Sequence, residues 1–279
     1  MTASAAITTA RPRWQTGVRI AGLAGLGIIA LTVALSDMLA RAPADRVNVR
    51  QVSLPPSAAF PFCTDIAGRD VLSETLHGLS VTSEQAVIAA LTTIIVGALG
   101  GFLAARLRFR LGYGVRWTAG IFGAVTPLLL AILFIAVTNR SLAPLSAGLA
   151  AAPLAFARTF DRARRLASSR HAEFARATGI GALTLLRRDL VYEMRRSLLT
   201  IGGRGLASGT IILSTVSFLG FGAMPPHRDL GLMVAGAFAT ARASSNFTMW
   251  WTALFPAMAL ALVILFARLA AGVEDGARP

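Results

Sequence analysis

The sequence predicts an all-α protein that crosses a membrane about six times. Of its 279 residues, 55% are hydrophobic and only 14% are charged, whereas soluble domains usually carry about 25% charged residues. The mean hydropathy is +0.65. The apolar residues gather in stretches close to the ~20 residues that a helix needs to cross ~30 Å of hydrocarbon. The lipid bilayer is therefore the expected solvent for most of the chain.

Six stretches are long and apolar enough to span, or nearly so. They are 18–38, 86–105, 117–138, 141–157, 205–224 and 247–267. The fourth is short, rich in alanine, glycine and proline, and separated from the third by Asn139 and Arg140 alone. The first resembles a signal peptide with a small-x-small site at 40–42, but its apolar stretch exceeds the usual 7–15 residues. We therefore favour a retained membrane anchor.

The arginines predict the orientation, because short cytoplasmic loops retain positive charge. All 27 basic residues are arginine. With the N-terminus inside, the cytoplasmic side receives Arg11, Arg13, Arg19, Arg106, Arg108, Arg110, Arg116, the run from Arg158 to Arg204, Arg268 and Arg278. Only seven lie outside: Arg41, Arg46, Arg50, Arg69, Arg140, Arg228 and Arg242. This asymmetry favours six crossings, with a cytoplasmic tail over 1–16, one transmembrane domain over 17–279 and both termini in the cytoplasm.

Two loops are long enough to hold structure. The external stretch 40–80 contains four prolines and is expected to be extended or rich in turns. In the cytoplasmic stretch 158–204, apolar residues recur at helical spacing among the arginines. Gly179 and Gly181 interrupt this pattern. We expect a helix, a glycine turn and a second helix on the inner membrane surface.

Catalytic and nucleic-acid-binding functions find no support in the sequence. The net charge of +14 follows the membrane topology, so it does not indicate a nucleic acid partner. There is no phosphate-binding loop, HExxH motif or Gly-x-Ser-x-Gly motif, and one cysteine excludes an intrachain disulfide. Cys63, Asp65 and His77 could gather a metal outside the membrane, but without ligand spacing we favour ordinary loop residues.

Three stretches in order carry a family resemblance. They are Thr64-Asp65-Ile66-Ala67-Gly68-Arg69-Asp70-Val71-Leu72-Ser73 with Gly78, then Glu173-Phe174-Ala175-Arg176-Ala177-Thr178-Gly179, then Ser217-Phe218-Leu219-Gly220-Phe221-Gly222 with Pro225-Pro226 and Leu230-Gly231-Leu232-Met233. They resemble the T-D-x-x-G-R-D-x-x-S, E-A-A-x-x-x-G and S-F-L-G-L-G…P-P…W-G-x-M segments of ABC importer permeases of the dipeptide/oligopeptide/nickel class. The resemblance covers about 60–270 and implies a type I permease fold and the second, C-type permease subunit.

Departures from the family pattern indicate a diverged member. Cys63 stands where the family usually has glycine, and Phe174 replaces the first alanine of E-A-A. Tyr192 stands where a proline commonly closes the loop, and Leu230 replaces tryptophan. The tail at Arg268 lacks the usual Asn-Leu. These changes bear on the solute rather than on the architecture.

The resemblance implies that the cytoplasmic loop couples the chain to an ATPase. The residues carried over for this role are Glu173, Phe174, Ala175, Ala177, Thr178 and Gly179. Implied partners are a homologous second permease, two ATP-binding subunits and a periplasmic or lipid-anchored solute-binding protein in the bacterial inner membrane. ATP and Mg²⁺ are expected on the ATPase subunits, with no cofactor in this chain. The alternative is an arginine-rich helix lying on anionic lipid, which can coexist with coupling.

Four charged residues are candidates for an external vestibule: Asp65, Arg69, Asp70 and Glu84. For the first three, a salt-bridged turn that caps the second helix is the simpler interpretation, with direct capture of solute as the alternative. Glu84 is expected at the outer start of the second helix, where the helix dipole favours a carboxylate. Its functional alternative is contact with a cationic solute.

The resulting hypothesis is a permease subunit for ATP-driven uptake of di- and oligopeptides by alternating access. A nickel or metallophore importer is the alternative within transport. A membrane scaffold without a pathway is the alternative from another class. An intramembrane enzyme is disfavoured, because the apolar segments contain no cluster of titratable residues.

Overall fold

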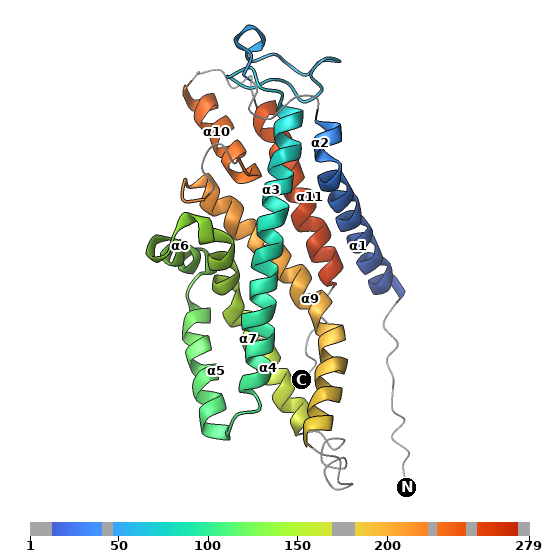
Figure 1. Cartoon of the computed structure of the whole chain (residues 1–279), viewed down its shortest axis with the longest axis vertical. Coiled ribbons are helices and arrows are strands. Elements are labelled where there is room, and N and C mark those ends of the chain that lie inside the picture. The colour runs from blue at the N-terminus through green and yellow to red at the C-terminus, as the bar shows by residue number, and fades with distance from the viewer. Residues whose placement is uncertain (1–12, 41–46, 169–181, 223–227, 244–249, 273–279) are drawn as a thin grey trace.

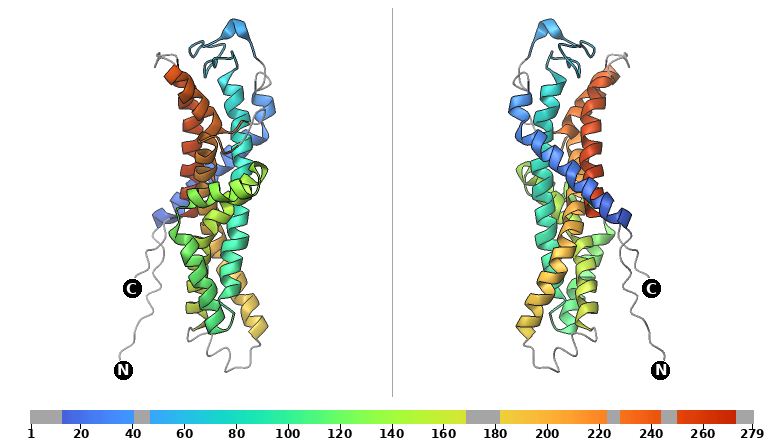
Figure 2. Two further views of the ribbon diagram at one scale, coloured as in Figure 1. Left: turned by 90° about the vertical axis from the view of Figure 1, so that its left-hand side faces the viewer. Right: turned by 90° about the vertical axis from the view of Figure 1, so that its right-hand side faces the viewer.

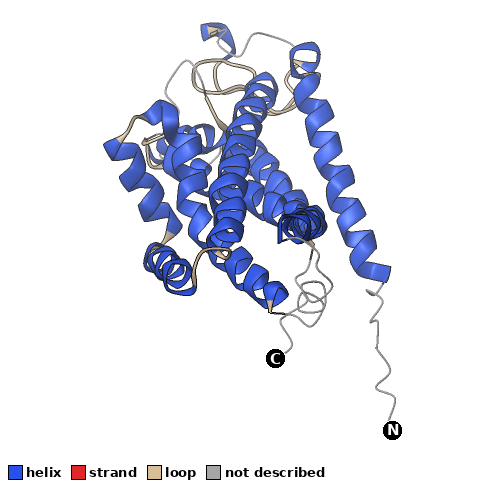
Figure 3. Cartoon of the chain, turned by 60° about the horizontal axis from the view of Figure 1, so that its bottom comes forward, coloured by secondary structure: helices blue, strands red, loops and turns tan. Residues whose placement is uncertain are grey.

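The computed structural model describes residues 13–40, 47–168, 182–222, 228–243 and 250–272. These residues form helices and loops, and their one β contact is an isolated bridge between Thr64 and Asp70 (Figure 3). The predicted all-α fold is confirmed.

The described helices follow one another along the chain in a fixed order, and the longest described connection between them is 52–70. Their bounds are α1 Arg13–Ala34, α2 Ser36–Leu39, η1 Val49–Gln51, α3 Val71–Thr92, η2 Thr93–Leu99, α4 Gly100–Ala104, α5 Phe109–Ala124, α6 Pro127–Val137, η3 Arg140–Leu142, α7 Ala143–Ala167, α9 Ala182–Phe218, α10 Leu230–Ala243 and α11 Trp251–Ala271.

The helices form a long, narrow bundle with two distinct ends (Figures 1 and 2). One end carries residues 47–70, which we call the outer segment. The opposite end, which we call the basic end, holds the last turns of α7 and the start of α5, with the arginines of 106–110 and 158–165. Between them, the core joins α3, α6, α7 and α9 through Ala89, Leu130, Ala131, Ile135, Ala147, Leu213 and Val216. The predicted orientation in the membrane stays a prediction.

The first and last described helices pack against each other in opposite directions. At one end Arg19 of α1 donates hydrogen bonds to the carbonyl oxygen of Ala271 (2.9 Å) and the hydroxyl of Thr200 (2.8 Å). Farther along, Ile29 and Val33 pack against the cluster that contains Val263. The start of α1 and the end of α11 therefore lie on the same side, as an even number of crossings requires.

The second predicted segment, 86–105, is wrong at its beginning. The structure has one helical run over Val71–Ala104, 34 residues long, in which a π-helical stretch (η2) joins α3 to α4. The polar residues before position 86 do not end the helix, because Ser73, Glu74, Thr75 and Thr82 are buried against other helices. The helix therefore extends through these polar residues, which are buried inside the protein.

Within the part of the chain that the structure describes, three helices are long and apolar enough to cross a membrane: Trp14–Ala34, Val71–Ala104 and Trp251–Ala271. A fourth span is possible if α5 and α6 count together, although they meet at an angle of 96°. The predicted third segment, 117–138, is therefore broken rather than straight. The predicted fourth segment, 141–157, begins in η3 and continues in α7, and the fifth begins in the second half of α9. The count of six stays a prediction, as does the division into a tail and one domain.

Ion pairing and aromatic contacts hold α5 against α7 near the basic end. Arg116 donates two hydrogen bonds to the carboxylate of Asp161, at 3.2 and 3.1 Å. Arg164 donates to the carbonyl oxygen of Leu107 (3.0 Å) and lies over the ring of Tyr113. The predicted cytoplasmic loop, 158–204, begins at this end of the bundle. The first predicted helix of the loop starts within the end of α7, and the second is continuous with α9.

Candidate functional site

The outer segment ends in a tight turn that the first motif builds. The backbone N–H of Asp65 donates to the carbonyl oxygen of Arg69 at 3.0 Å. In return, Oδ1 of Asp65 accepts hydrogen bonds from the backbone N–H groups of Ala67 and Arg69, both at 2.8 Å. Gly68 has a φ of 72°, a left-handed conformation that costs glycine little. The carboxylate of Asp65 therefore stabilises the turn.

Thr64 fastens this turn to the preceding part of the outer segment. Its fully buried hydroxyl donates to the carbonyl oxygen of Gln51 (2.6 Å) and accepts from the N–H of Leu54 (2.8 Å). Both polar functions of the hydroxyl are satisfied, as burial requires.

Asp70 is the N-cap of α3. Its carboxylate accepts hydrogen bonds from the backbone N–H groups of Leu72 and Ser73, both at 3.3 Å, and from the hydroxyl of Ser73 at 2.7 Å. A cap of this kind satisfies donors in the first turn that have no partner within the helix. The Asp-x-x-Ser end of the first motif is therefore a helix cap, as the simpler interpretation expected.

Cys63 occupies a backbone conformation that suits glycine better. Its φ is 83°, in the left-handed region that is uncommon for other residues, which explains why glycine is usual here in the resembled family. The thiol is buried. Burial, followed by the negative charges of Asp65 and Asp70, raises its pKa to about 12. The thiol therefore stays neutral and is a poor nucleophile or metal ligand.

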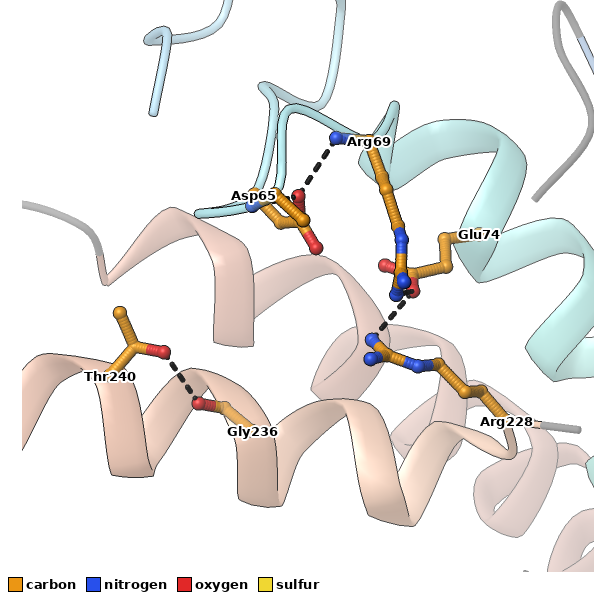
Figure 4. A network of polar contacts seen from close by, with 7 residues as sticks. Asp65, Arg69, Glu74, Arg228, Gly236 and Thr240 are labelled. Atoms are coloured by element: carbon orange, nitrogen blue, oxygen red, sulfur yellow. Dashed lines mark hydrogen bonds and ion pairs between the residues drawn. The ribbon is translucent and has the colours of Figure 1, made fainter. Parts of the chain in front are cut away.

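Glu74, in the first turn of α3, joins two arginines that are far apart in the sequence (Figure 4). Its Oε1 lies 2.8 Å from Nη1 of Arg228 and 3.5 Å from Nη1 of Arg69. The Glu74 side chain is 5% exposed, whereas those of Arg228 and Arg69 are 35% and 20% exposed. A carboxylate so deeply buried is tolerated only with partners. These three residues, which we call the outer triad, tie the outer segment and α3 to the start of α10.

The outer triad borders a cavity of about 160 Å³ between the outer segment, α10 and the start of α11. Asp65, Arg69, Glu74 and Arg228 line one side, and small residues of α10 line the other (Figure 4). The cavity therefore presents two guanidinium groups and two carboxylates, with formal charges that cancel.

The third motif converges on the same end of the bundle. Ser217, near the end of α9, donates a hydrogen bond to the carboxylate of Asp229, which also accepts from the N–H of Leu232 at 2.8 Å. Asp229 is fully buried. Burial raises its pKa, and these two hydrogen bonds act in the opposite direction. A Cβ at Gly231 would meet the backbone of Ser214 at 2.4 Å, so α9 and α10 approach this closely only because glycine is present.

Comparison with known proteins supports the sequence resemblance. The chain is 27% identical over 259 residues to a putative peptide transport system permease protein of Brucella suis, covering 92% of this chain and 84% of that protein. It is 25% identical to the probable D,D-dipeptide transport system permease protein DdpC of Escherichia coli over 89% of this chain and 83% of DdpC. It is also 25% identical to the dipeptide transport system permease protein DppC of Haemophilus influenzae, over 92% and 89% of the two chains. No family model matches the chain.

The chain is a homologue of these transport permeases. The resemblance that the three motifs predicted is thereby confirmed. Together with the apolar helices, it makes the chain a multi-pass membrane protein.

The structure brings three of the four vestibule candidates together and separates the fourth. Asp65 and Arg69 line the cavity, while Asp70 caps α3 beside it. Glu84 was expected at the start of the second helix, and this position is wrong. It is exposed and lies well inside α3, which begins at Val71. The favourable interaction of a carboxylate with a helix N-terminus therefore does not apply to Glu84, because this interaction fades beyond the first turn of a helix.

The predicted coupling residues lie outside the described residues. These are Glu173, Phe174, Ala175, Ala177, Thr178 and Gly179, within 169–181. Their role stays a prediction. The metal site considered for Cys63, Asp65 and His77 finds no support: no group of three or more His, Cys, Asp or Glu side chains in the described part of the chain is placed to hold a metal ion.

The sequence interpretation missed Glu74, Arg228 and Asp229. Glu74 follows the Asp70 cap by four residues, so it lies over the first turn of the same helix. Arg228 and Asp229 stand directly before the Leu230-Gly231 part of the third motif. A charged pair so close to a motif was the available signal, but the 154 residues between Arg228 and Glu74 conceal their contact.

Proposed function

We propose that this chain is a transmembrane permease subunit of an ABC importer that takes up di- and oligopeptides. The observation that carries the proposal is similarity over about nine-tenths of the chain to several permease proteins of peptide transport systems. A bundle of apolar helices supports the same role. The chain is a transport subunit and not an enzyme.

The complex requires further subunits. In this proposal a homologous second permease completes the pathway, two ATP-binding subunits supply the energy, and a periplasmic or lipid-anchored protein delivers the solute. ATP and Mg²⁺ belong to the ATP-binding subunits, and this chain carries no cofactor. The relatives are parts of transport systems by name, which supports a multi-subunit assembly.

The proposed site is the bacterial inner membrane, with the basic end in the cytoplasm. Support comes from the arginines of 106–116 and 158–165, which lie at the end of the bundle opposite the outer segment. Positively charged loops remain on the cytoplasmic side. The ATP-binding subunits would then meet the stretch between α7 and α9, where the predicted coupling residues are.

The decisive experiment is purification of the complex from its native membrane, followed by peptide uptake in proteoliposomes. We expect ATP-binding subunits to co-purify, and ATP to drive accumulation of a labelled dipeptide at least tenfold over a control without ATP. Nickel and a nickel chelate serve as comparison solutes. Co-purification of no ATPase, with no ATP-driven uptake, would favour a membrane scaffold.

Variants of the cytoplasmic loop test the coupling role. Gly179→Pro and Glu173→Arg are expected to abolish ATP-driven uptake while the chain still inserts in the membrane. His171→Ala, in the same loop but outside the motif, is the matched control and should retain uptake. Full uptake by both motif variants would exclude coupling through this stretch.

A further inference from the structure

Glu84 places a carboxylate on the exposed face of α3. The same face continues at helical spacing through Val87 and Leu91 to Ile95 in η2, whose exposed fractions are 47%, 52% and 58%. The opposite face of the helix packs against α7 and α9. Among the described residues, none forms a hydrogen bond or ion pair with the Glu84 side chain. Glu84 is thus an unpaired acidic group on a surface that is otherwise apolar.

A contact between α2 and α3 marks the outer limit of the apolar region. Nε2 of His77 lies 3.6 Å from Oδ1 of Asp37. Asp37 belongs to α2, directly beyond the apolar span Trp14–Ala34. The level of these two polar residues is therefore where α1 and α3 leave the apolar region. Glu84 follows His77 by seven residues, which places it about 10 Å deeper at 1.5 Å per residue.

Contacts of α9 mark the inner limit. A Cβ at Gly203 would meet the carbonyl oxygen of Ala267, near the end of α11, at 2.8 Å. A Cβ at Gly205 would meet Cα of Ala90 in α3 at 3.2 Å. Ala90 therefore lies within a turn of the inner end of α11, and it is six residues past Glu84, or about 9 Å. Glu84 lies between the two limits, where α1 and α11 run beside α3 (Figure 1).

A carboxylate at this depth requires water or a partner charge. Ionisable residues within membrane-spanning segments almost always face a water-filled cavity or the interior of a bundle, because lipid solvates charge poorly. Ser83 and Gln85 flank Glu84 with further polar groups, and the hydroxyl of Ser83 has no hydrogen-bond partner among the described residues. Three polar side chains in succession suit an aqueous surface better than an apolar protein interface.

We propose that the face of α3 at Glu84 lines the aqueous pathway of the importer, where its carboxylate favours cationic groups of the solute, such as an ammonium, over anionic groups. This inference rests on the proposed function, because a pathway requires the assembled transporter. A fixed charge in a water-filled passage with low-dielectric walls attracts opposite charge and repels like charge. Glu84 is then a residue that determines the charge specificity of transport.

The first test measures access of water to this face in the assembled transporter with Cys63→Ser, which removes the sole cysteine of the chain. Val87→Cys places a thiol one turn from Glu84. Leu31→Cys is the matched control, because Leu31 is 60% exposed and lies six residues from Asp37, about 9 Å deep. A water-soluble trimethylammonium methanethiosulfonate, added to both faces of the membrane, should modify the Val87→Cys variant at least tenfold faster than the control.

The second test measures the effect of the Glu84 charge. At Val87→Cys, the rate with the trimethylammonium reagent is divided by the rate with its sulfonate analogue. Adding Glu84→Gln should lower this ratio about tenfold, because positive and negative unit charges ~6 Å from a carboxylate differ by about that factor even in water. Adding Glu84→Asp, which keeps the charge, should leave the ratio within about twofold.

Three results would overturn the inference. Modification of the Val87→Cys variant by a lipid-soluble maleimide alone would place this face against lipid. Modification by neither class of reagent would place it under another subunit. An unchanged ratio with Glu84→Gln would remove the charge selection. If the parent complex transports no peptide, the proposed function fails, while the thiol reactions still decide whether this face meets water and whether Glu84 selects charge there.

Discussion

Removal of Arg228 from the outer triad should loosen the outer segment. Arg228→Ala takes away the guanidinium 2.8 Å from Glu74 and leaves Arg69 at 3.5 Å as the remaining partner. Removing one partner of a buried ion pair costs about 3–5 kcal/mol, whereas exposed pairs contribute about 0–1 kcal/mol. Because Glu74 is 5% exposed but Arg228 is 35% exposed, we place the cost at about 2 kcal/mol. This corresponds to about a 30-fold change in an opening equilibrium.

The sole cysteine supplies the assay for this opening. Cys63 is buried beside the turn of the outer segment, so its thiol reacts with a disulfide reagent only when the segment opens. At pH 8 in detergent, the Arg228→Ala variant should react about 30-fold faster than the parent protein.

Two further variants show whether the ion pair is responsible. Arg50→Ala, at an exposed position of the outer segment, is the matched control and should react at the parent rate. The double variant with Glu74→Gln should be less reactive than Arg228→Ala alone, because the buried charge is gone. A rate for Arg228→Ala within twofold of the parent would refute this account of the outer triad.

Three further predictions concern single groups at the same end. Asp70→Ala should lower the free energy of unfolding by about 1 kcal/mol through loss of the cap, with Asp70→Asn retaining most of it in a denaturant titration. The pKa of Cys63 rises from 9.0 to about 12 on folding, so the folded state keeps the proton that the unfolded state loses. Stability should then fall by about 1.4 kcal/mol per pH unit above pH 9, and this slope should be absent in Cys63→Ser. Burial raises the pKa of Asp229 above its unfolded-state value of 3.8. The contribution of Asp229 to the free energy of unfolding should therefore fall as pH rises above 3.8. The variant Asp229→Asn should not show this fall in unfolding curves at weakly acidic pH.

The sequence predicted the helical bundle because apolar length and arginine placement are both local signals. The first and last spans illustrate this, since 18–38 and 247–267 correspond to α1 and α11 within a few residues at most ends. The second segment was placed too late because only the apolar stretch 86–105 was counted, and polar residues such as Thr75 and Thr82 precede it. These residues are buried in the structure, and such long-range packing leaves no local mark in a sequence.

The same limit applies to the candidate site. Asp65, Arg69 and Asp70 were found because they form one motif, and the structure confirms the turn and the cap that their spacing indicated. Glu74 was missed because its principal partner, Arg228, is 154 residues away. The 96° bend of α5 against α6 was also missed, although Pro127 within an apolar stretch was a visible signal.

The first and third motifs are best understood as one structural layer that ties three helices together at the outer end. The N–H of Leu230 donates to the buried hydroxyl of Thr82 at 3.1 Å, which adds to the bonds of Glu74 with Arg228 and of Ser217 with Asp229. α9 runs without interruption for 37 residues, about 55 Å, from beside the predicted coupling residues to this layer. A rigid helix of that length moves as a unit. A displacement imposed on α9 at the basic end should therefore carry α3 and α10 with it, whereas the bent junction of α5 and α6 lies outside this layer.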